Sequence, residues 1–390
     1  MEPTGPADPT FLMEPAVRSR IMQLEGFPAY VYDLAGLRAH AAAVRAALPT
    51  VELFYAAKAN PDPRLLTVLE PYVDGIEVSS GGELAHVRET LPGIRLAFGG
   101  PGKTDAELEL ALRLDVERFH VESPRELERL FALCHAAGRS AHVLLRVNLD
   151  VTVQGAALTM SGPFGMDEAG VGRCLRMLPR MPLLRLRGVH AHLASGLDAP
   201  AMLDLAAKIV GWARRHVGGT EVNLGGGMAV DYRTPGTRFD WAAYGMGLAR
   251  LAGDGETLRV EPGRAVTAYH GWYVTDVLEV KETRGEAFAV LRGGTHHLRT
   301  PVTKGHDQPF TVIPRGGSAG PDGGRPPTPR TATLVGQLCT PKDVFARDVP
   351  VGRLRAGDVV AFGMAGAYAW NISHHDFLMH PRPVFHYVGG

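Results

Sequence analysis

Short apolar runs alternate with longer segments of helical periodicity through the middle of the chain. In the longer segments, apolar residues recur three and four positions apart, as they do on one face of an amphipathic helix. The segment after Ser123 is typical, because Pro124 stands at the first helical position and Glu126 follows the N-cap serine by three residues. The apolar runs predict eight strands, at residues 51–59, 75–80, 94–99, 118–121, 142–148, 186–193, 221–224 and 257–260.

Eight strands that alternate with helices favour an α/β fold with a (β/α)8 TIM barrel. A doubly wound sheet is disfavoured, since the early Gly-x-Gly-x-x-Gly turn typical of such sheets is absent from the sequence. After Glu261 the pattern changes, and strand-like runs follow one another with no helical segment between them, at 273–282, 287–292, 331–338 and 358–362. These runs predict a separate C-terminal all-β domain.

The change of pattern sets the expected domain boundaries. We expect an N-terminal lead-in at 1–27 that packs on the β-domain, a barrel at 28–265 and the β-domain at 266–390. Within the β-domain, the stretch 314–330 is rich in Gly, Pro and Arg and predicts a long irregular loop.

Charge and cysteine content narrow the classes of partner. Lysine plus arginine equals aspartate plus glutamate, at 41 each among 390 residues, which gives no support for a nucleic-acid or anionic-membrane partner. The three cysteines are odd in number and fit no zinc spacing, so we expect a reducing cytoplasm. The sequence starts without the features of a secretory signal, and no apolar run reaches the roughly 20 residues of a membrane span.

Polar residues gather where the predicted strands end, the edge at which barrels of this kind carry their active sites. Lys58 follows an apolar run, and desolvation there would leave a nucleophilic amine. Three glycines at 225–227 would let backbone N–H groups approach a phosphate. Glu261 could hold a proton on a heterocyclic nitrogen, and Arg264 could reach the same phosphate. The full set is Lys58, Glu77, Arg146, His190, His192, Ser195, Gly225, Gly226, Gly227, Glu261 and Arg264.

Each of these features also has a structural interpretation. A lone lysine past a strand often extends to solvent, glycines often only permit a turn, and a Glu–Arg pair at a turn is often a surface salt bridge. His190 and His192 are two positions apart and share a face of the predicted strand, so they could bind a metal. The sequence suggests no third ligand nearby, and we therefore expect no metal.

Six motifs in sequence resemble the fold-type III pyridoxal-phosphate (PLP) decarboxylases, the group of diaminopimelate, ornithine and arginine decarboxylases. They occur in the same order and cover nearly the whole chain from about residue 28, namely Tyr55–Asn60, His190–Gly196, Gly225–Gly227, Glu261–Arg264, Cys339–Asp343 and Gly366–Tyr368. The resemblance implies an alanine-racemase-like barrel joined to a β-domain, PLP as cofactor and decarboxylation at Cα.

The resemblance also implies roles for single residues. Lys58 would bind the cofactor covalently, His192 would stack on its ring and Glu261 would pair with its ring nitrogen. Cys339 would serve as the acid that protonates Cα after CO2 has left, and with Asp343 it would come from the second subunit of a homodimer with shared sites. The remaining cofactor contacts would be made by Arg146, Ser195, Gly225, Gly226, Gly227, Gly263, Arg264 and Tyr368.

Departures from the relatives concern the substrate. Diaminopimelate and ornithine decarboxylases carry an acidic residue directly after this cysteine, where the chain has Thr340. The segments 293–301 and 374–377 also differ, and both are rich in basic residues. His296, His297 and Arg299, with Thr340 and Asp343, are therefore expected to bind the substrate. The pattern is similar to the branch that acts on conjugates in siderophore assembly, such as citryl-diaminopropionate decarboxylases, and predicts a substrate with an anionic distal end.

Other functions remain open on the sequence alone. They are an ordinary diaminopimelate decarboxylase, an amino-acid racemase on the same scaffold, and a non-catalytic PLP-binding homologue. The histidines at 296, 297, 374 and 375 are equally compatible with a structural role in the β-domain.

Overall fold

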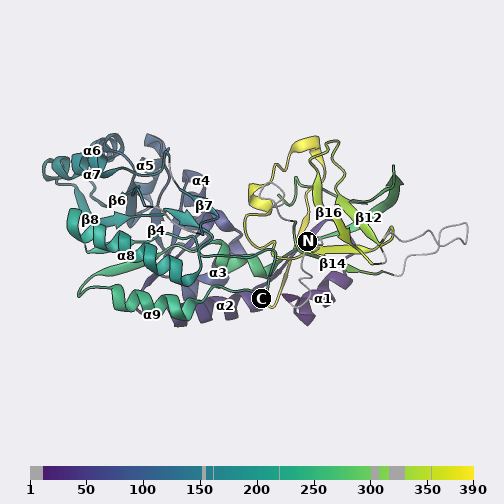
Figure 1. The fold of residues 1–390 in the computed structure, drawn as a ribbon. Coiled ribbons are helices and arrows are strands. Elements are labelled where there is room, and N and C mark those ends of the chain that lie inside the picture. The colour runs from purple at the N-terminus through teal and green to yellow at the C-terminus, as the bar shows by residue number, and fades with distance from the viewer. Residues whose placement is uncertain are drawn as a thin grey trace, which may run out of the picture. The chain divides into compact units, whose positions relative to one another are not determined.

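The structure, a computed structural model, describes residues 12–151, 155–160, 162–218, 220–299, 307–315, 330–352 and 354–390. They form two compact units (Figure 1). The barrel unit contains Arg38–Ala229 and Phe239–Val266. The β unit contains the described residues up to Leu37, the segment Val230–Arg238 and those from Thr267 to Gly390.

The barrel unit is a closed barrel of parallel strands, which confirms the predicted fold class. The strands follow the order of the sequence, and β11 closes onto β2 through the pairs Arg259–Glu52 and Val260–Leu53. They are β2 (Glu52–Ala56), β3 (Gly75–Val78), β4 (Arg95–Phe98), β5 (Arg118–Val121), β6 (Ala141–Arg146), β8 (Leu184–His190), β10 (Glu221–Asn223) and β11 (Thr257–Val260). The first residue of each observed strand lies within two positions of the first residue of a predicted strand.

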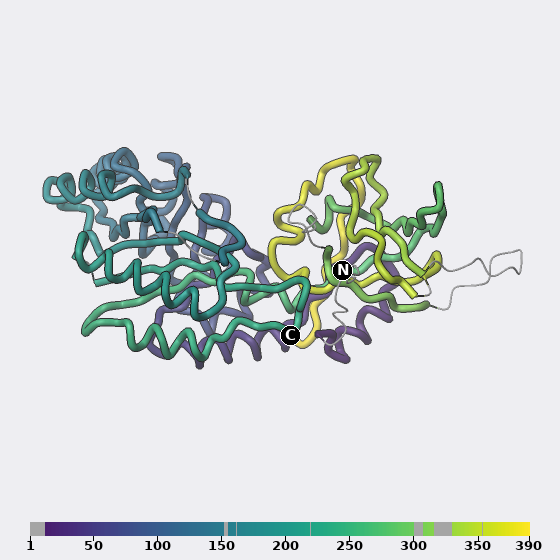
Figure 2. The backbone as a smooth tube through the Cα atoms, viewed as in Figure 1, coloured from purple at the N-terminus to yellow at the C-terminus, as the bar shows by residue number. Residues whose placement is uncertain are grey.

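Helices connect the strands on the outside of the barrel, and the chain path can be followed in Figure 2. They are α2 (Leu34–Ala47), α3 (Pro63–Leu69), α4 (Gly81–Thr90), α5 (Asp105–Arg113), α6 (Pro124–Ala137), α7 (Glu168–Met177), α8 (Ala199–His216), α9 (Trp241–Leu251) and α10 (Arg264–Thr267). A side-chain oxygen caps the N-terminus of every helix from α3 to α9, through Asp62, Ser80, Thr104, Ser123, Asp167, Asp198 and Asp240. Each cap contributes about 1 kcal/mol and fixes where the loop after a strand ends.

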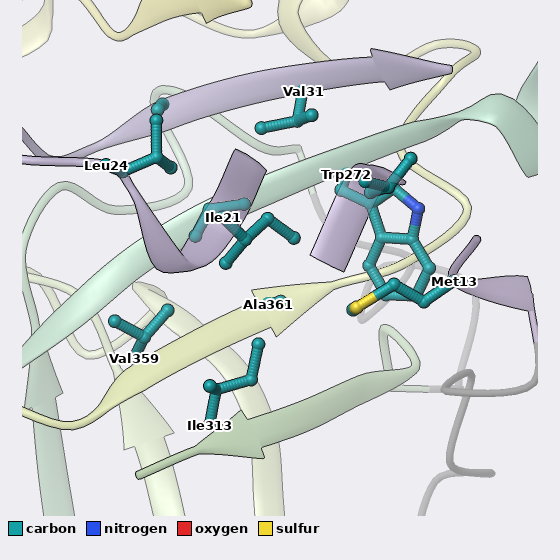
Figure 3. Close-up of a cluster of buried hydrophobic side chains, with 11 residues drawn as sticks. Met13, Ile21, Leu24, Val31, Trp272, Ile313, Val359 and Ala361 are labelled. Atoms are coloured by element: carbon teal, nitrogen blue, oxygen red, sulfur yellow. The ribbon is translucent and has the colours of Figure 1, made fainter. Parts of the chain in front are cut away.

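The β unit is built on one mixed sheet, in which β1 pairs antiparallel with β12 and parallel with β18. Its strands are β1 (Ala29–Asp33), β12 (Gly271–Thr283), β13 (Glu286–Leu291), β14 (Phe310–Ile313), β15 (Thr331–Val335), β16 (Val344–Pro350), β17 (Val359–Phe362) and β18 (Val384–Val388). The short helix α1 (Pro15–Met22) belongs to the same unit. Ile21 and Leu24 pack with Trp272 and the sheet residues Ile313 and Val359 (Figure 3). Each such aliphatic side chain, once buried, contributes about 1.5–3 kcal/mol.

Two features of the β unit differ from the expectation. β1 and residues up to Leu37 belong to the β unit, although the barrel was expected to begin at residue 28. A strand followed by a helix has the same sequence pattern whether or not the strand enters the barrel, which explains the difference. The strands β14, β16 and β18 were not predicted, and residues 316–329 of the expected 314–330 loop lie outside the described residues.

Candidate active site

Lys58 lies directly after β2, in the 3₁₀ turn Ala57–Ala59. The strand was predicted to run on to residue 59, but it ends at Ala56. Lys58 Nζ donates to Glu77 Oε2 at 2.6 Å, and Ser79 Oγ donates to the other oxygen of Glu77 at 2.9 Å. The Lys58 side chain is 46% exposed while that of Glu77 is 5% exposed. An accessible amine is therefore held by a carboxylate inside the barrel.

Three glycines follow β10 and form a tight cradle. Gly225 and Gly227 have φ angles of 67° and 112°, which strain any residue with a side chain. An added Cβ would lie 2.5 Å from the backbone oxygen of Glu261 at Gly226, and at Gly227 it would meet the backbone oxygen of Ala194 more closely still. Only glycine fits at these positions. The N–H groups of Gly225 and Gly226 donate to side chains of the barrel unit, Asn223 Oδ1 and His192 Nδ1, each at 3.0 Å.

His192 closes one side of this cradle. The backbone N–H of Gly226 donates to His192 Nδ1 at 3.0 Å, so the ring proton is assigned to Nε2. Burial, followed by the positive charges of Lys58 and Arg146, lowers the pKa of His192 to about 3. The ring is therefore neutral near pH 7. The expectation that His190 and His192 share a strand face was wrong, since β8 ends at His190 and His192 lies in the following loop.

Glu261 follows β11 and is 6% exposed. Its Oε1 accepts from Asn223 Nδ2 at 2.6 Å, and its Oε2 lies 3.2 Å from His190 Nε2. His120 of β5 lies further from it, with Nε2 3.7 Å from Oε1. Neither Asn223 nor His120 was among the functional candidates predicted from the sequence. Each is a polar residue two positions after a charged one in a predicted strand, and this was the available signal.

His120, His190 and Glu261 are also grouped closely enough to suggest a metal site, with ligand atoms within 4.8 Å of one another. The two imidazole rings, however, are stacked with centroids 4.1 Å apart and planes 10° apart. Ring nitrogen lone pairs lie in the ring planes, so those of two parallel rings run side by side and do not converge on one ion. The geometry favours a hydrogen-bonding role for these histidines.

Arg146 ends β6 in a buried ionic network. Its guanidinium donates to Glu122 Oε1 at 2.6 Å, and Glu122 also accepts from the backbone N–H groups of Gly100 and Gly165. Glu126, one turn into α6, accepts from the Glu122 backbone and pairs with Lys103 at 2.8 Å. Arg146 is thus held at the C-terminal end of its strand by Glu122, which is itself held by backbone hydrogen bonds.

The other predicted cofactor residues in the barrel unit lie on the same strand ends. Ser195 lies in the two-residue strand β9 (Ala194–Ser195), which pairs with β7 (Leu158–Thr159). Gly263 approaches the turn of Lys58 so closely that an added Cβ would lie 2.7 Å from the Cβ of Ala59. Arg264 is the first residue of α10. The structure therefore brings Lys58, Gly263 and Arg264 to adjoining strand ends.

In the β unit, Cys339 is exposed on the turn between β15 and β16. The carboxylate of Asp343 anchors this turn, accepting from the backbone N–H groups of Leu338 at 2.8 Å and Thr295 at 2.7 Å. Burial raises the pKa of Asp343. Thr340 accepts a backbone hydrogen bond from Asp343 within the same turn. In this chain, therefore, Asp343 holds the loop of Cys339 and Thr340 against the segment of Thr295.

The three basic residues predicted for substrate binding have different surroundings. His296 and His297 are 0% and 1% exposed, and their rings are 3.7 Å apart. Burial, together with neighbouring histidines, lowers their pKa values to about 4 and about 3, so both are neutral near pH 7. Arg299, in contrast, is exposed. Tyr368 has a positive φ of 49° and is partly buried in the same unit.

Comparison with known proteins decides the family. A family model described as "Pyridoxal-dependent decarboxylase, pyridoxal binding domain" matches residues 34–268, more than half of the chain. The chain belongs to the pyridoxal-dependent decarboxylases. The predicted cofactor, pyridoxal phosphate, and the predicted decarboxylase activity are confirmed at the level of this family.

Curated relatives match nearly the whole chain, beyond the residues that the family model covers. The chain is 38% identical over 97% of its length to the 2-[(L-alanin-3-ylcarbamoyl)methyl]-2-hydroxybutanedioate decarboxylase of Staphylococcus aureus, of which 98% is covered. It is 29% identical to the L-glutamyl-[BtrI acyl-carrier protein] decarboxylase of Niallia circulans, with 92% of this chain and 87% of the relative covered. It is 30% identical to a diaminopimelate decarboxylase of Bacteroides thetaiotaomicron, with 87% and 90% covered.

Solved structures show the same fold. Diaminopimelate decarboxylase from Helicobacter pylori in complex with L-lysine superposes with a TM-score of 0.84 at 24% identity, over 95% of this chain and 94% of that one. This likeness supports the combination of a barrel with a β-rich unit.

Proposed function

We propose that this decarboxylase removes the α-carboxylate of an amino-acid conjugate whose distal end carries carboxylates, an intermediate of siderophore or related biosynthesis. The observation that carries the proposal is the identity of 38% along nearly the full length of both chains to the Staphylococcus aureus relative. The printed name of that relative's substrate joins an alanyl group to a hydroxybutanedioate, which bears two carboxylates. Loss of an acidic residue at Thr340 agrees, because an anionic end needs no carboxylate partner.

The strand ends of the barrel unit fit pyridoxal phosphate. The glycine cradle would lie against the phosphate, Arg264 would supply a cation for it, and His192 offers a neutral flat ring. Lys58 is the accessible amine, and Glu77 Oε2 is placed to accept a proton from its Nζ. Glu261 would face the ring nitrogen. When bound, the cofactor supplies a protonated ring that takes up the electron pair left behind by CO2.

Proton return to Cα is assigned to Cys339, which would come from a second subunit. Its thiol is exposed, and the turn that carries it is fixed by the backbone hydrogen bonds to Asp343. A fixed and accessible thiol is what a positioned general acid requires. We therefore propose a homodimer in which the β unit of each chain completes the barrel site of the other.

Arg299 is the residue we propose for the distal carboxylates. It is exposed and permanently charged, and its planar guanidinium matches a carboxylate in a bidentate manner. The pKa values of His296 and His297 leave them neutral, so they would contribute shape or neutral hydrogen bonds. This division of roles refines the expectation that all three residues supply positive charge.

A panel of substrates tests the proposal. CO2 release is measured with a citryl-diaminopropionate conjugate, free diaminopropionate, meso-diaminopimelate, lysine, ornithine and arginine. We expect the conjugate to give the highest kcat/KM by at least tenfold. A preference for meso-diaminopimelate would instead support the alternative of lysine biosynthesis, which the relatives at 26–33% identity represent. Racemisation without CO2 release, or cofactor binding with no turnover of any amino acid, would favour the racemase or non-catalytic alternatives.

A variant isolates the distal contact. Arg299→Ala should lower kcat/KM for the conjugate, by the equivalent of about 2–4 kcal/mol if the bound substrate buries the charge pair. Arg347→Ala is the matched control, because Arg347 is another exposed arginine of the β unit. Affinity for pyridoxal phosphate should not change in either variant. An Arg299→Ala protein as active as the Arg347→Ala protein would contradict the assignment of Arg299.

The proposed location is the cytoplasm. Within the described part of the chain, no helix is both long and apolar enough to cross a membrane.

A further inference from the structure

The carboxylate of Glu261 is held by one hydrogen-bond donor on each oxygen. Asn223 Nδ2 donates to Oε1 at 2.6 Å, and His190 Nε2 lies 3.2 Å from Oε2. Glu261, Asn223 and His190 are all less than 7% exposed, so water does not compete with these donors. They come from three adjacent barrel strands, since β10 pairs with both β8 and β11.

The orientation of the Asn223 amide follows from a second hydrogen bond. Asn223 Oδ1 accepts from the backbone N–H of Gly225 at 3.0 Å, so Nδ2 must face Glu261. One side chain thus joins the first glycine of the cradle to the carboxylate. The two groups assigned to opposite ends of the cofactor are therefore fixed relative to each other within the barrel.

The proton on His190 is also determined by its partner. An ionised carboxylate can only accept, so His190 must carry its hydrogen on Nε2 and donate it. Burial first, and then the positive charges of Arg146 and neighbouring groups, lowers the pKa of His190 well below its ordinary value. His120 stacks on the same ring at 4.1 Å, and its pKa is likewise well below the ordinary value, chiefly because of burial. His190 is thus a neutral donor, and its ring cannot rotate freely against the stacked His120.

A neutral donor has a specific advantage at this position. A protonated His190 would place a second cation beside Glu261 and compete with a protonated ring nitrogen for the same carboxylate. A neutral imidazole orients the carboxylate and leaves its full negative charge for the cofactor. We propose that His190 and Asn223 are positioning residues that hold the Glu261 carboxylate directed at the ring nitrogen, with His120 bracing His190. This inference rests on the proposed role of Glu261 in cofactor binding.

The test uses variants that remove one donor without changing the volume much. His190→Phe keeps a ring that can stack on His120 but removes the donor on Oε2. His190→Gln restores a donor near the position of Nε2. Asn223→Leu removes the donor on Oε1. The matched control is His142→Phe, because His142 is a half-buried barrel histidine that contacts Arg118 and not Glu261. Far-UV circular dichroism and the melting temperature establish that each variant is folded.

Two measurements report on Glu261 apart from turnover. The first is the Kd of pyridoxal phosphate from its visible absorbance, and the second is the ¹⁵N chemical shift of ring-labelled cofactor near neutral pH. We expect His190→Phe and Asn223→Leu to weaken binding about tenfold or more, as loss of a hydrogen bond to a charged group does. Their ring-nitrogen signal should move toward the unprotonated value, in the same direction as in Glu261→Gln. His190→Gln and His142→Phe should resemble the wild type.

Different outcomes would contradict the positioning role of His190 and Asn223 and the proposed cofactor role of Glu261. If the wild type binds the cofactor with a protonated ring nitrogen and folded His190→Phe and Asn223→Leu proteins do the same with unchanged Kd, the positioning role is wrong. If His190→Phe does not fold, Asn223→Leu carries the same test of a removed donor. If the wild type does not bind pyridoxal phosphate, or Glu261→Gln leaves the ring-nitrogen signal unchanged, the proposed function of the site fails first.

Discussion

The N-terminal end of the barrel carries a buried ion pair whose loss should be costly. Arg118, the first residue of β5, donates to both oxygens of Glu221, the first residue of β10, with Nε 2.6 Å and Nη2 2.5 Å away. The two side chains are 9% and 7% exposed. Because β6 and β8 lie between these strands in the barrel order, the pair must cross the barrel interior. Arg118→Met keeps much of the apolar stem and removes the charge.

The loss in free energy of unfolding depends on the charges that remain around Glu221 in the variant. Removing one partner of a buried pair costs about 3–5 kcal/mol, because an uncompensated charge stays behind. Arg187 Nε lies 3.0 Å from Glu221 Oε1 and is 42% exposed, so part of the compensation survives. We therefore expect Arg118→Met to lower the free energy of unfolding by about 3 kcal/mol at neutral pH. The matched control is Arg125→Met, whose pair with Glu128 is 3.4 Å long and 79% and 50% exposed, and which should cost at most about 0.5 kcal/mol.

Urea unfolding followed by far-UV circular dichroism measures both variants. With an unchanged slope, Arg118→Met should lower the midpoint by roughly 0.5–1 M, because the slope in urea is about 3 kcal/mol/M or more for a large chain. Arg118→Met combined with Glu221→Leu should recover much of the loss, because no buried charge is then left unpaired. The reasoning is refuted if Arg118→Met costs no more than Arg125→Met, or if the double variant is as unstable as the single one.

Three further predictions concern acid stability and the site. Burial raises the pKa of Glu221, but the hydrogen bond and charge of Arg118 outweigh burial and lower it overall. The stabilisation that ionised Glu221 gives the folded protein is therefore complete above the unfolded pKa and is lost as pH falls through the folded pKa. The urea midpoints of wild type and Arg118→Met should converge from neutral to acid pH, and parallel curves would contradict this. Borohydride reduction of the loaded enzyme should place the pyridoxyl label on the peptide of Lys58, and Lys58→Ala should abolish both label and turnover; a label on another peptide would disprove the assignment. Mixing inactive Lys58→Ala with inactive Cys339→Ala should restore activity in exchanged dimers, and verified exchange without recovery would mean that one chain builds the whole site.

The barrel could be predicted because its strands and helices have different hydrophobic periods, and the helix caps at Ser123 and its counterparts can be read locally. The strand β1 could not be assigned to the β unit, because its partners in β12 lie 239 to 245 residues away and such pairing leaves no trace in a local pattern. The motifs placed Lys58 and Glu261, since each follows a strand. His120 was missed because it lies 141 residues before Glu261, and only closure of the barrel brings the two side chains together.

The same limit applied to the β unit, where the sequence gives charge but not burial. His296 and His297 were interpreted as basic groups for a substrate, yet both are buried and their pKa values are low. Asp343 was expected to contact the substrate, and its carboxylate instead accepts backbone hydrogen bonds from two loops. Their substrate roles remain predictions, and the contacts show what each residue does within its own chain.

Three strands show how one short sequence pattern serves both stability and chemistry. β5 places Arg118 and His120 two residues apart, β10 places Glu221 and Asn223, and β11 with its following residue places Arg259 and Glu261. Because alternate residues of a strand share a face, all six side chains face the barrel interior in two layers, roughly 7 Å apart. The lower layer consists of paired charges, while the upper layer holds Glu261 among neutral donors. Arg118 and Arg259 in the lower layer each pair with a carboxylate, and Glu261 in the upper layer accepts a hydrogen bond from the neutral Asn223. Both layers depend on the register of these strands, since a shift of one residue would turn the side chains of both layers away from the barrel interior.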